Sequence, residues 1–454
     1  MKTIAVAGAT GFIGRWFIQQ YSKKYKIVAL SRSEVKSDAY PEVEWRQVDL
    51  YSLSSTTEAL KGVDYALYLV HSMQPSTRLN QGSFEDTDLL LADNFSRAAE
   101  ACNLKHVIFI GGILPKETAD FSTHLRSRYE TEQTLGARSV PFTAIRAGII
   151  IGPGGSSFRV VQNLVNGLPI MACPKWCKSP SQPIDVRDML SIIDSSLGEE
   201  RLFGKSIEVG GKETVSYMDL LRRTSRKMGK KRIIFSIPFF TLGFSKLWVA
   251  LFSKSSRTFV SPLIESLKHD MRVKDEQSAE LPEPQCALDE SIEKAIFEKG
   301  PSLKRKSSGE DEKNTVRSVQ RLDNIARKSA EWVADAYPKW LPSLFRYLLT
   351  ARQVEEDTIF RLLGVNLLHL QYQPGRSDED RRLFFIIGGV LAKRVDYGWL
   401  EFRSVLDNRY IIAAIHEFVP ALPWTIYKYS QALMHLFVMN QFNRFLARQV
   451  KTVD

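Results

Sequence analysis

The stretch that decides the fold is Thr3-Ile-Ala-Val-Ala-Gly-Ala-Thr-Gly-Phe-Ile-Gly14. Its first five residues predict a buried β-strand, and three glycines follow that strand directly. Gly8 permits a sharp turn, Gly11 lets the backbone approach phosphates, and Gly14 lets the next helix pack closely on the strand. Glycines in this position between a strand and a helix predict a site for the pyrophosphate of a dinucleotide.

The residues after the glycines predict an amphipathic helix. Phe12, Ile13, Trp16, Phe17 and Tyr21 share one face at helical spacing. Within this segment, the residues that we expect to contact the cofactor are Gly8, Thr10, Gly11, Phe12, Ile13, Gly14 and Arg15.

The end of the second predicted strand indicates which dinucleotide binds. An NAD-specific site usually has an acidic residue there, which accepts hydrogen bonds from the ribose 2′-hydroxyl. This chain has Arg32 after the strand 26–30, and Arg15 just behind the third glycine. Guanidinium groups match the extra 2′-phosphate of NADP, so we expect NADP(H) rather than NAD(H). The alternative, that Arg32 is a solvated loop residue, stays open.

Composition places the chain among globular proteins. It has 454 residues, 44% of them hydrophobic and 25% charged, which suits two or three domains. The net charge of +11 comes without a nucleic-acid-binding motif, so we expect no nucleic-acid partner. The four cysteines are sparse for this length, and the spacing of Cys173 and Cys177 fits neither a zinc ribbon nor a redox motif, so we expect no metal. Because the first residues already predict a strand, we expect no signal peptide and a cytoplasmic protein.

One apolar segment, 233–252, is nearly long enough to span a membrane. It contains Pro238, Gly243 and Lys246, and a basic loop at 253–257 follows it. We therefore predict a helix of a capping subdomain rather than a span. Peripheral contact with the inner membrane is the alternative.

Alternating patterns predict an α/β domain over residues 1–290. Further strands are expected at 43–48, 65–70, 106–110 and 142–151, with helices at 84–102 and 125–135. This order predicts a doubly wound parallel Rossmann sheet with its ligand at the carboxyl ends of the strands. A small capping subdomain with a short strand at 206–209 follows at about 152–290.

A charged stretch predicts a flexible linker over 300–318. After the linker, the alternation of strands and helices gives way to consecutive strands. In the predicted domain 319–454, strands are expected at 367–373, 383–392, 399–406 and 410–418, and one long helix from Pro423 to Val450. Asp407-Asn408 predicts a hairpin turn between the last two strands. Antiparallel strands with a C-terminal helix predict an α+β helix-grip unit. Two interpretations of its aromatic residues stay open: they enclose an apolar ligand, or they fill a solid core.

Several motifs together resemble the atypical short-chain dehydrogenases/reductases, in the NmrA-like and complex-I-subunit-like branch. They are Gly8-x-x-Gly11-x-x-Gly14, Arg32, Asp49-Leu50, Val70-His71-Ser-Met73, His124-Leu-Arg-Ser-Arg128, Arg146-Ala-Gly-Ile-Ile-Ile-Gly152, Gln182-Pro-Ile and Asp188. The resemblance implies cofactor contacts from Asp49, Leu50, Val70, His71 and Arg128. The C-terminal part resembles a poorly characterised domain that follows such Rossmann domains, related to START-like folds.

Redox-active members of this family use a serine and a Tyr-x-x-x-Lys pair, in which the tyrosine delivers a proton. This chain has Gly111-Gly112 in the place of the serine and His124-x-x-x-Arg128 in the place of the pair. His124 and His71 are the candidate proton donors, since histidine titrates near neutral pH. Arg128 is the candidate for holding the ribose.

Two functions follow. The first is an NADP(H)-dependent oxidoreductase or isomerase that acts on an apolar carbonyl, quinone or lipid-like small molecule. The second is an NADP(H) sensor, or an assembly partner of a membrane enzyme, that binds the cofactor without turnover.

Overall fold

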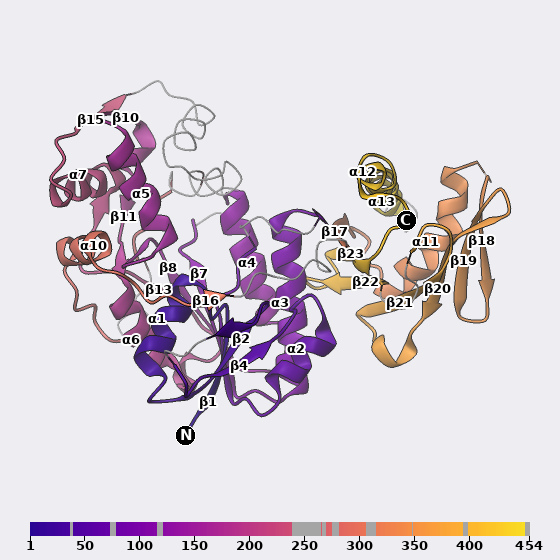
Figure 1. Cartoon of the computed structure of the whole chain (residues 1–454), viewed down its shortest axis with the longest axis horizontal. Coiled ribbons are helices and arrows are strands. Elements are labelled where there is room, and N and C mark those ends of the chain that lie inside the picture. The colour runs from indigo at the N-terminus through magenta and orange to yellow at the C-terminus, as the bar shows by residue number, and fades with distance from the viewer. Residues whose placement is uncertain are drawn as a thin grey trace. The chain divides into compact units, whose positions relative to one another are not determined.

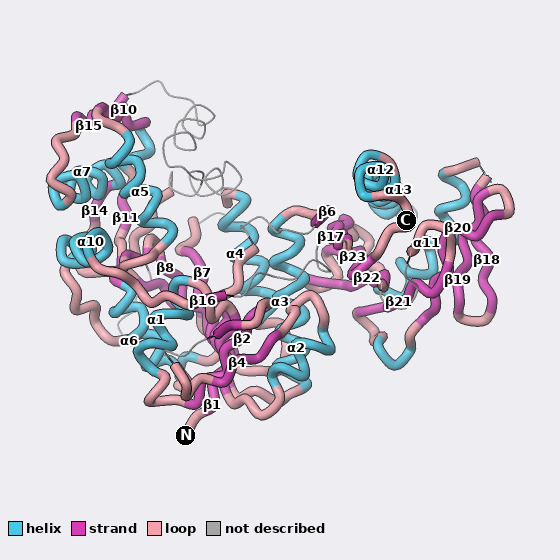
Figure 2. Tube along the Cα trace, in the orientation of Figure 1, coloured by secondary structure: helices cyan, strands magenta, loops and turns pink. Residues whose placement is uncertain are grey.

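The structure is a computed structural model that describes residues 1–36, 40–72, 79–115, 121–237, 265, 269–274, 281–305, 315–346, 348–393 and 398–449 (Figures 1 and 2). The chain forms two compact units. The first comprises Met1–Gln74 and Asn94–Ser307, and the second comprises Pro75–Asp93 and Ser308–Asp454.

A parallel sheet of seven strands forms the centre of the first unit. The strands are β1 (Thr3–Ala7), β2 (Lys26–Ser31), β4 (Glu44–Gln47), β5 (Tyr65–Tyr68), β7 (His106–Gly112), β8 (Phe142–Ala147) and β13 (Ser206–Val209). They lie in the order β13-β8-β7-β5-β1-β2-β4, and each neighbouring pair is parallel. The order reverses between β1 and β5, which places the ligand-binding crevice of such a sheet at their carboxyl ends. The predicted Rossmann class is confirmed.

Helices cover both faces of this sheet (Figure 1). One face carries α1 (Phe12–Tyr21) and α6 (Val186–Ser196); the other carries α2 (Leu53–Leu60), α4 (Thr123–Leu135) and the second half of α3 (Phe84–Ala101). The central strand β1 is buried on both faces, and its residues Ile4 to Ala7 are accordingly apolar and fully buried.

The capping elements correct three predictions. The strand predicted over 142–151 is two strands, β8 and β9 (Ile150–Ile151), and β9 pairs with β12 (Ile184–Asp185) instead of the main sheet. The predicted strand at 206–209, assigned to the cap, is β13 of the main sheet.

The third correction concerns the predicted helix at 233–252. Its first residues form β15 (Ile233–Ile237), which pairs in parallel with β10 (Ile170–Pro174), and residues 238–252 lie outside the described part. Among the described residues, no helix is both long enough and apolar enough to cross a membrane.

Short elements complete the first unit. They are β3 (Val35–Lys36), α5 (Ser156–Gly167), η2 (Lys175–Lys178), β11 (Pro180–Ser181), η3 (Glu200–Leu202), β14 (Val215–Ser216), α7 (Tyr217–Lys227), α10 (Leu288–Phe297) and β16 (Lys304–Arg305).

The second unit contains a sheet of eight strands in the order β18-β19-β20-β21-β22-β23-β17-β6. The strands are β6 (Leu79–Gln81), β17 (Val316–Asp323), β18 (Leu349–Val354), β19 (Asp357–Leu362), β20 (Val365–Tyr372), β21 (Arg381–Gly388), β22 (Trp399–Val405) and β23 (Tyr410–Phe418). Of the described pairs, only β17 with β6 is parallel. The predicted antiparallel sheet is confirmed. The strands β17, β18 and β19 and the helix α11 (Ala330–Leu344) were not predicted, and β17 begins inside the predicted linker.

The predicted C-terminal helix is interrupted. Ser430, with φ −128° and ψ −83°, separates α12 (Trp424–Tyr429) from α13 (Gln431–Arg448). The aromatic rings of α11, α13 and the sheet pack directly against one another: Phe442 lies 4.9 Å from Trp340 and 5.0 Å from Tyr337 between ring centroids. At this position the aromatic residues form a packed core.

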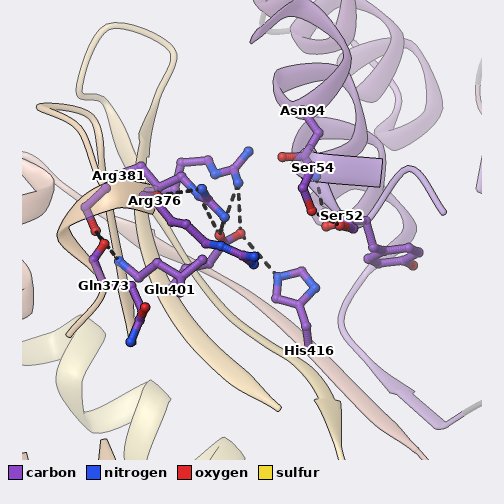
Figure 3. A network of polar contacts seen from close by, with 12 residues as sticks. Ser52, Ser54, Asn94, Gln373, Arg376, Arg381, Glu401 and His416 are labelled. Atoms are coloured by element: carbon purple, nitrogen blue, oxygen red, sulfur yellow. Dashed lines mark hydrogen bonds and ion pairs between the residues drawn. The ribbon is translucent and has the colours of Figure 1, made fainter. Parts of the chain in front are cut away.

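The opposite face of the second sheet carries buried charges. On β22, Leu400 and Phe402 belong to the apolar core, so Glu401 and Arg403 point to the other face. Glu401 accepts hydrogen bonds from Arg381 at 2.7 Å and from Arg403 at 3.0 Å (Figure 3). Burial raises the pKa of Glu401, but these two guanidinium groups outweigh burial and hold that pKa well below its usual range.

The first half of α3 covers this charged face within the second unit. Asp93 accepts a hydrogen bond from the buried Arg403 at 2.7 Å, and Asp86 accepts one from Arg321 at 2.7 Å. Gln81 of β6 also donates to the carbonyl of Ala432 at 3.0 Å. These contacts explain why residues 75–93 belong to the second unit, although they precede it by more than 200 residues.

The Asp93–Arg403 pair yields a stability prediction. Asp93→Asn removes the negative charge facing a fully buried guanidinium, so we expect the free energy of unfolding of the full chain to fall by about 3 kcal/mol. Chemical denaturation measures this change. The matched control is Asp407→Asn, which removes the partner of Arg327 from an exposed pair and is expected to cost less than about 0.5 kcal/mol. Equal losses in the two variants would contradict the prediction.

His106, at the start of β7, predicts a pH dependence of stability in the first unit. Its Nδ1 accepts the N–H of Gly198 at 3.2 Å, and its Nε2 contacts the hydroxyl of Thr143 at 2.9 Å. Burial, with a smaller contribution from Lys2, lowers the pKa of His106 to about 4. A lowered pKa means that the folded state favours neutral histidine, so stability is lost as pH falls from about 6.5 to about 4, by up to about 3 kcal/mol.

Denaturation of the full chain at several pH values checks this prediction. His106→Asn keeps an acceptor but does not titrate, so we expect a shallower fall of unfolding free energy between about pH 6.5 and about pH 4. An unchanged slope in this variant would show that other groups cause the pH dependence.

Candidate nucleotide-binding site

The glycine loop brings α1 into direct contact with the end of β1. The N–H of Gly11 donates to the carbonyl of Gly8 at 2.8 Å, and Gly8 has φ +89°. A Cβ on Gly14 would lie 2.5 Å from the carbonyl oxygen of Gly8, and one on Gly8 would lie 3.0 Å from the backbone of Leu69. The loop therefore needs glycine at these positions, for the reasons that the sequence indicated.

The first turn of α1 is suited to an anion. Gly11 is the N-cap, and among the described residues no side chain caps it and no acidic residue lies in the first turn. Uncapped N–H groups and the helix dipole favour phosphate at this end. Thr10, Phe12 and Ile13 are half-buried around it. The residues present therefore fit a dinucleotide pyrophosphate.

The two arginines predicted to select NADP(H) occupy different environments. Arg15 donates from Nε to the carbonyl of Gly11 at 3.2 Å, which holds its side chain along the helix start. Arg32 is exposed directly after β2, and its guanidinium makes no hydrogen bond or ion pair with the described residues. It is therefore accessible to a 2′-phosphate, as the prediction requires.

Asp49 and Leu50 follow β4 and have structural contacts. The carboxylate of Asp49 accepts the N–H of Tyr51 at 3.2 Å. Leu50 is buried, and its carbonyl accepts a hydrogen bond from Asn94 at 2.9 Å. Their predicted contacts with the cofactor stay predictions.

Arg128 ties together two strand ends at the same edge. Its guanidinium donates to the carbonyl of Val70 at 3.1 Å and to that of Ile110 at 2.5 Å. The same group lies over the ring of Phe109, 4.4 Å from the ring centroid. Arg128 thus fixes the carboxyl ends of β5 and β7, and its predicted contact with the ribose stays a prediction.

The structure brings the two candidate proton donors together. His71 follows β5 and His124 begins α4, and their ring centroids lie 5.3 Å apart with an interplanar angle of 43°. Leu69, two residues before His71, is the residue that a Cβ on Gly8 would approach to 3.0 Å. The two histidines therefore lie close to the predicted cofactor loop, although 53 positions separate them in sequence.

An ion pair that the sequence did not predict lies below Gly111. Arg146 donates to both oxygens of Glu132, at 2.6 and 3.0 Å, and Ser206 donates to the same carboxylate at 2.6 Å. A Cβ on Gly111 would lie 3.5 Å from that carboxylate. Burial lowers the pKa of Arg146, but the bonds to Glu132 outweigh it and raise that pKa. The sequence signal that could have indicated this ion pair is one charged residue on a buried helix, Glu132, and one on a buried strand, Arg146.

The loops after β9 and β11 and the first turn of α6 hold the cap in place. The indole of Trp16 donates to the carbonyl of Pro153 at 3.1 Å, which joins the loop at 152–155 to α1. Gln182 donates to Gly211 at 2.7 Å and accepts from Val273 at 3.2 Å. Asp188 accepts the N–H groups of 285 and 286 at 2.9 and 3.0 Å. Among the described residues, no cluster of three potential metal ligands occurs.

Comparisons with known proteins agree with this geometry. Residues 8–167 match the family model described as NAD(P)H-binding. Auxiliary protein GraX of Staphylococcus aureus is 29% identical over 141 residues, 30% of this chain and 41% of GraX. A sterol-4-alpha-carboxylate 3-dehydrogenase (decarboxylating) of Dictyostelium discoideum is 29% identical over 89 residues, 19% of this chain and 27% of that protein. The matches thus span less than half the length of these relatives.

Solved structures share the fold of the first unit. A nucleoside-diphosphate-sugar epimerase of Staphylococcus aureus superposes with a TM-score of 0.51 at 17% identity, over 64% of this chain and 100% of that chain. The triphenylmethane reductase of a Citrobacter species, complexed with NADP(H), gives 0.50 at 18%, over 64% and 99%. An NADPH-dependent quinone oxidoreductase of Escherichia coli, complexed with NADPH, gives 0.50 at 21%, over 64% and 98%.

The first unit therefore contains an NAD(P)H-binding domain and shares its fold with this epimerase and these two reductases. The prediction that this domain binds a nicotinamide dinucleotide is confirmed, and the cofactor class is NAD(P)H.

Arg32 provides a test of the preference for the 2′-phosphate. We expect Arg32→Ala to weaken NADPH binding by roughly 10- to 100-fold, because a charge-assisted contact with phosphate is lost. NADH lacks that phosphate, so its affinity in the same variant is the internal control and is expected to stay unchanged. Titration of the cofactor fluorescence measures both. Equal affinities of the wild type for NADH and NADPH would contradict the prediction.

Proposed function

We propose that the protein is an NADP(H)-dependent oxidoreductase that reduces an apolar carbonyl or quinone, with His124 as the proton donor. The observation that carries this proposal is the contact of His124 with His71 close to the glycine loop. In this fold, ligands bind at the carboxyl edge of the sheet, and both histidines lie there.

The chemistry needs a hydride and a proton. NADPH supplies the hydride when bound. Histidine is suited to deliver the proton to the substrate oxygen because it changes charge near neutral pH, whereas a guanidinium stays protonated. In this proposal His124 donates the proton, His71 orients its ring, and Arg128 holds the strand ends that position His71.

The surroundings of His124 support an apolar substrate. The start of α4 adjoins an apolar cluster of Ile113, Leu114, Leu125 and Met271, against which Phe121 packs. The Dictyostelium discoideum relative is named for a sterol substrate, which also supports this class.

Turnover with and without His124 tests the proposal. We expect His124→Ala to lower NADPH oxidation in a panel of quinones and aldehydes by roughly 10²- to 10⁴-fold, with NADPH affinity unchanged. The matched control is His369→Ala, which removes a partly exposed histidine of the second unit that pairs with Asp357. Full activity of His124→Ala would refute its assigned role.

A second candidate is an NADP(H) sensor that binds the cofactor without turnover. Three observations favour it: glycine stands in the place of the serine, Arg128 is engaged by two carbonyls, and Glu132 is engaged by Arg146. Tight NADPH binding by the wild type without turnover of any substrate in the panel, or of a membrane extract, would support the sensor and exclude the oxidoreductase.

A further inference from the structure

The cap of the first unit exposes apolar side chains on a small sheet, which we call the β10–β15 face. It consists of Ile170, Ile233 and Phe235, which are 56%, 62% and 44% exposed. Ile170 pairs with Ile233, and Ala172 with Phe235, so these positions share one side of the strand pair. The sheet lies at the outer end of the cap, beyond α5 and α7 (Figure 1).

The two sides of this strand pair have different environments. Met171 and Cys173 point inward and belong to the apolar core of the cap, and Ile234 packs against that core. A strand pair that packs one side on a core and turns the other side to solvent usually carries polar residues on the solvent side. Here the outer side is also apolar, which marks an interaction surface.

Basic side chains border the β10–β15 face. Lys175 and Lys178 lie on η2, which adjoins both strands, and Lys230 and Lys231 precede β15. Arg226, near the end of α7, is exposed as well. Within the described part of the chain, none of these five cations has a carboxylate within ion-pair distance.

The surrounding sequence has the same charge bias. Residues 220–237 contain seven lysines and arginines and no aspartate or glutamate. The seven are Arg222, Arg223, Arg226, Lys227, Lys230, Lys231 and Arg232, of which Arg222, Arg223 and Lys227 pair with acidic residues outside this segment. The whole chain has 62 basic and 51 acidic residues, so this segment departs strongly from the average.

We propose that the β10–β15 face docks on the surface of an anionic lipid bilayer. Apolar side chains that enter the headgroup region, beside lysines that contact anionic lipids, are the features of interfacial binding. A second copy of the chain fits less well, because two such faces repel each other. Nucleic acid would engage the cations but would leave the aliphatic side chains of Ile170 and Ile233 without a role.

Co-sedimentation of the full chain with vesicles tests this proposal. We expect binding to phosphatidylcholine vesicles with about 30% phosphatidylglycerol, little binding to phosphatidylcholine alone, and weaker binding as salt rises from about 0.05 M to about 0.5 M. Lys230→Glu/Lys231→Glu is expected to weaken binding by on the order of 30-fold or more. Ile233→Ser/Phe235→Ser is expected to weaken it at both salt concentrations.

Matched variants control for net charge and exposed apolar area. Lys299→Glu/Lys339→Glu makes the same charge change at exposed lysines elsewhere, and Ile325→Ser/Leu348→Ser removes exposed apolar side chains of the second unit. Both are expected to bind like the wild type. Thermal unfolding confirms that each variant is folded.

Three outcomes would overturn the proposal. They are no binding to anionic vesicles, equal losses in the control and test variants, and binding to duplex DNA but not to vesicles.

Discussion

The contact between Gly14 and the carbonyl of Gly8 sets the geometry of the first unit. A side chain at position 14 would approach that oxygen to 2.5 Å, so only glycine allows α1 to begin this close to β1. The close approach directs the uncapped N-terminus of α1 at the crevice where the strand order reverses. The cofactor loop, the edge that carries His71 and the docking of the cap on Trp16 all depend on this position of α1.

A polar network lies beside Gly111 and at the carboxyl ends of β5 and β7. Where the family resemblance implies a serine and a lysine, this chain has a glycine beside the Glu132–Arg146 pair and an arginine that joins two strand ends. Removing one partner of a buried pair leaves an uncompensated charge. Glu132 and Arg146 thus depend on each other, and a side chain at Gly111 would contact both.

In the second unit, buried charge also determines which residues belong together. Glu401, Arg403 and Arg381 are buried on the sheet face opposite the aromatic core, and Asp93 completes their charge balance. Burying a charge without a partner is costly, so the sheet requires an acidic helix on this face. The first half of α3 supplies it, which is why a segment near residue 90 is part of a unit otherwise built from residues after 307.

The sequence predicted the elements that depend only on residues close to one another in the chain. The glycine spacing, the apolar parallel strands and the hairpin between β22 and β23 follow from backbone freedom, burial and turn residues, and the sequence predicted each of them. The tertiary structure decided the partners of the short strands: β13 joins the main sheet, β9 leaves it, and residues 233–237 form a strand because β10 offers an edge. It also brought His71 to His124 and Asp93 to Arg403, since contacts between distant residues depend on topology and leave no periodic pattern in the sequence.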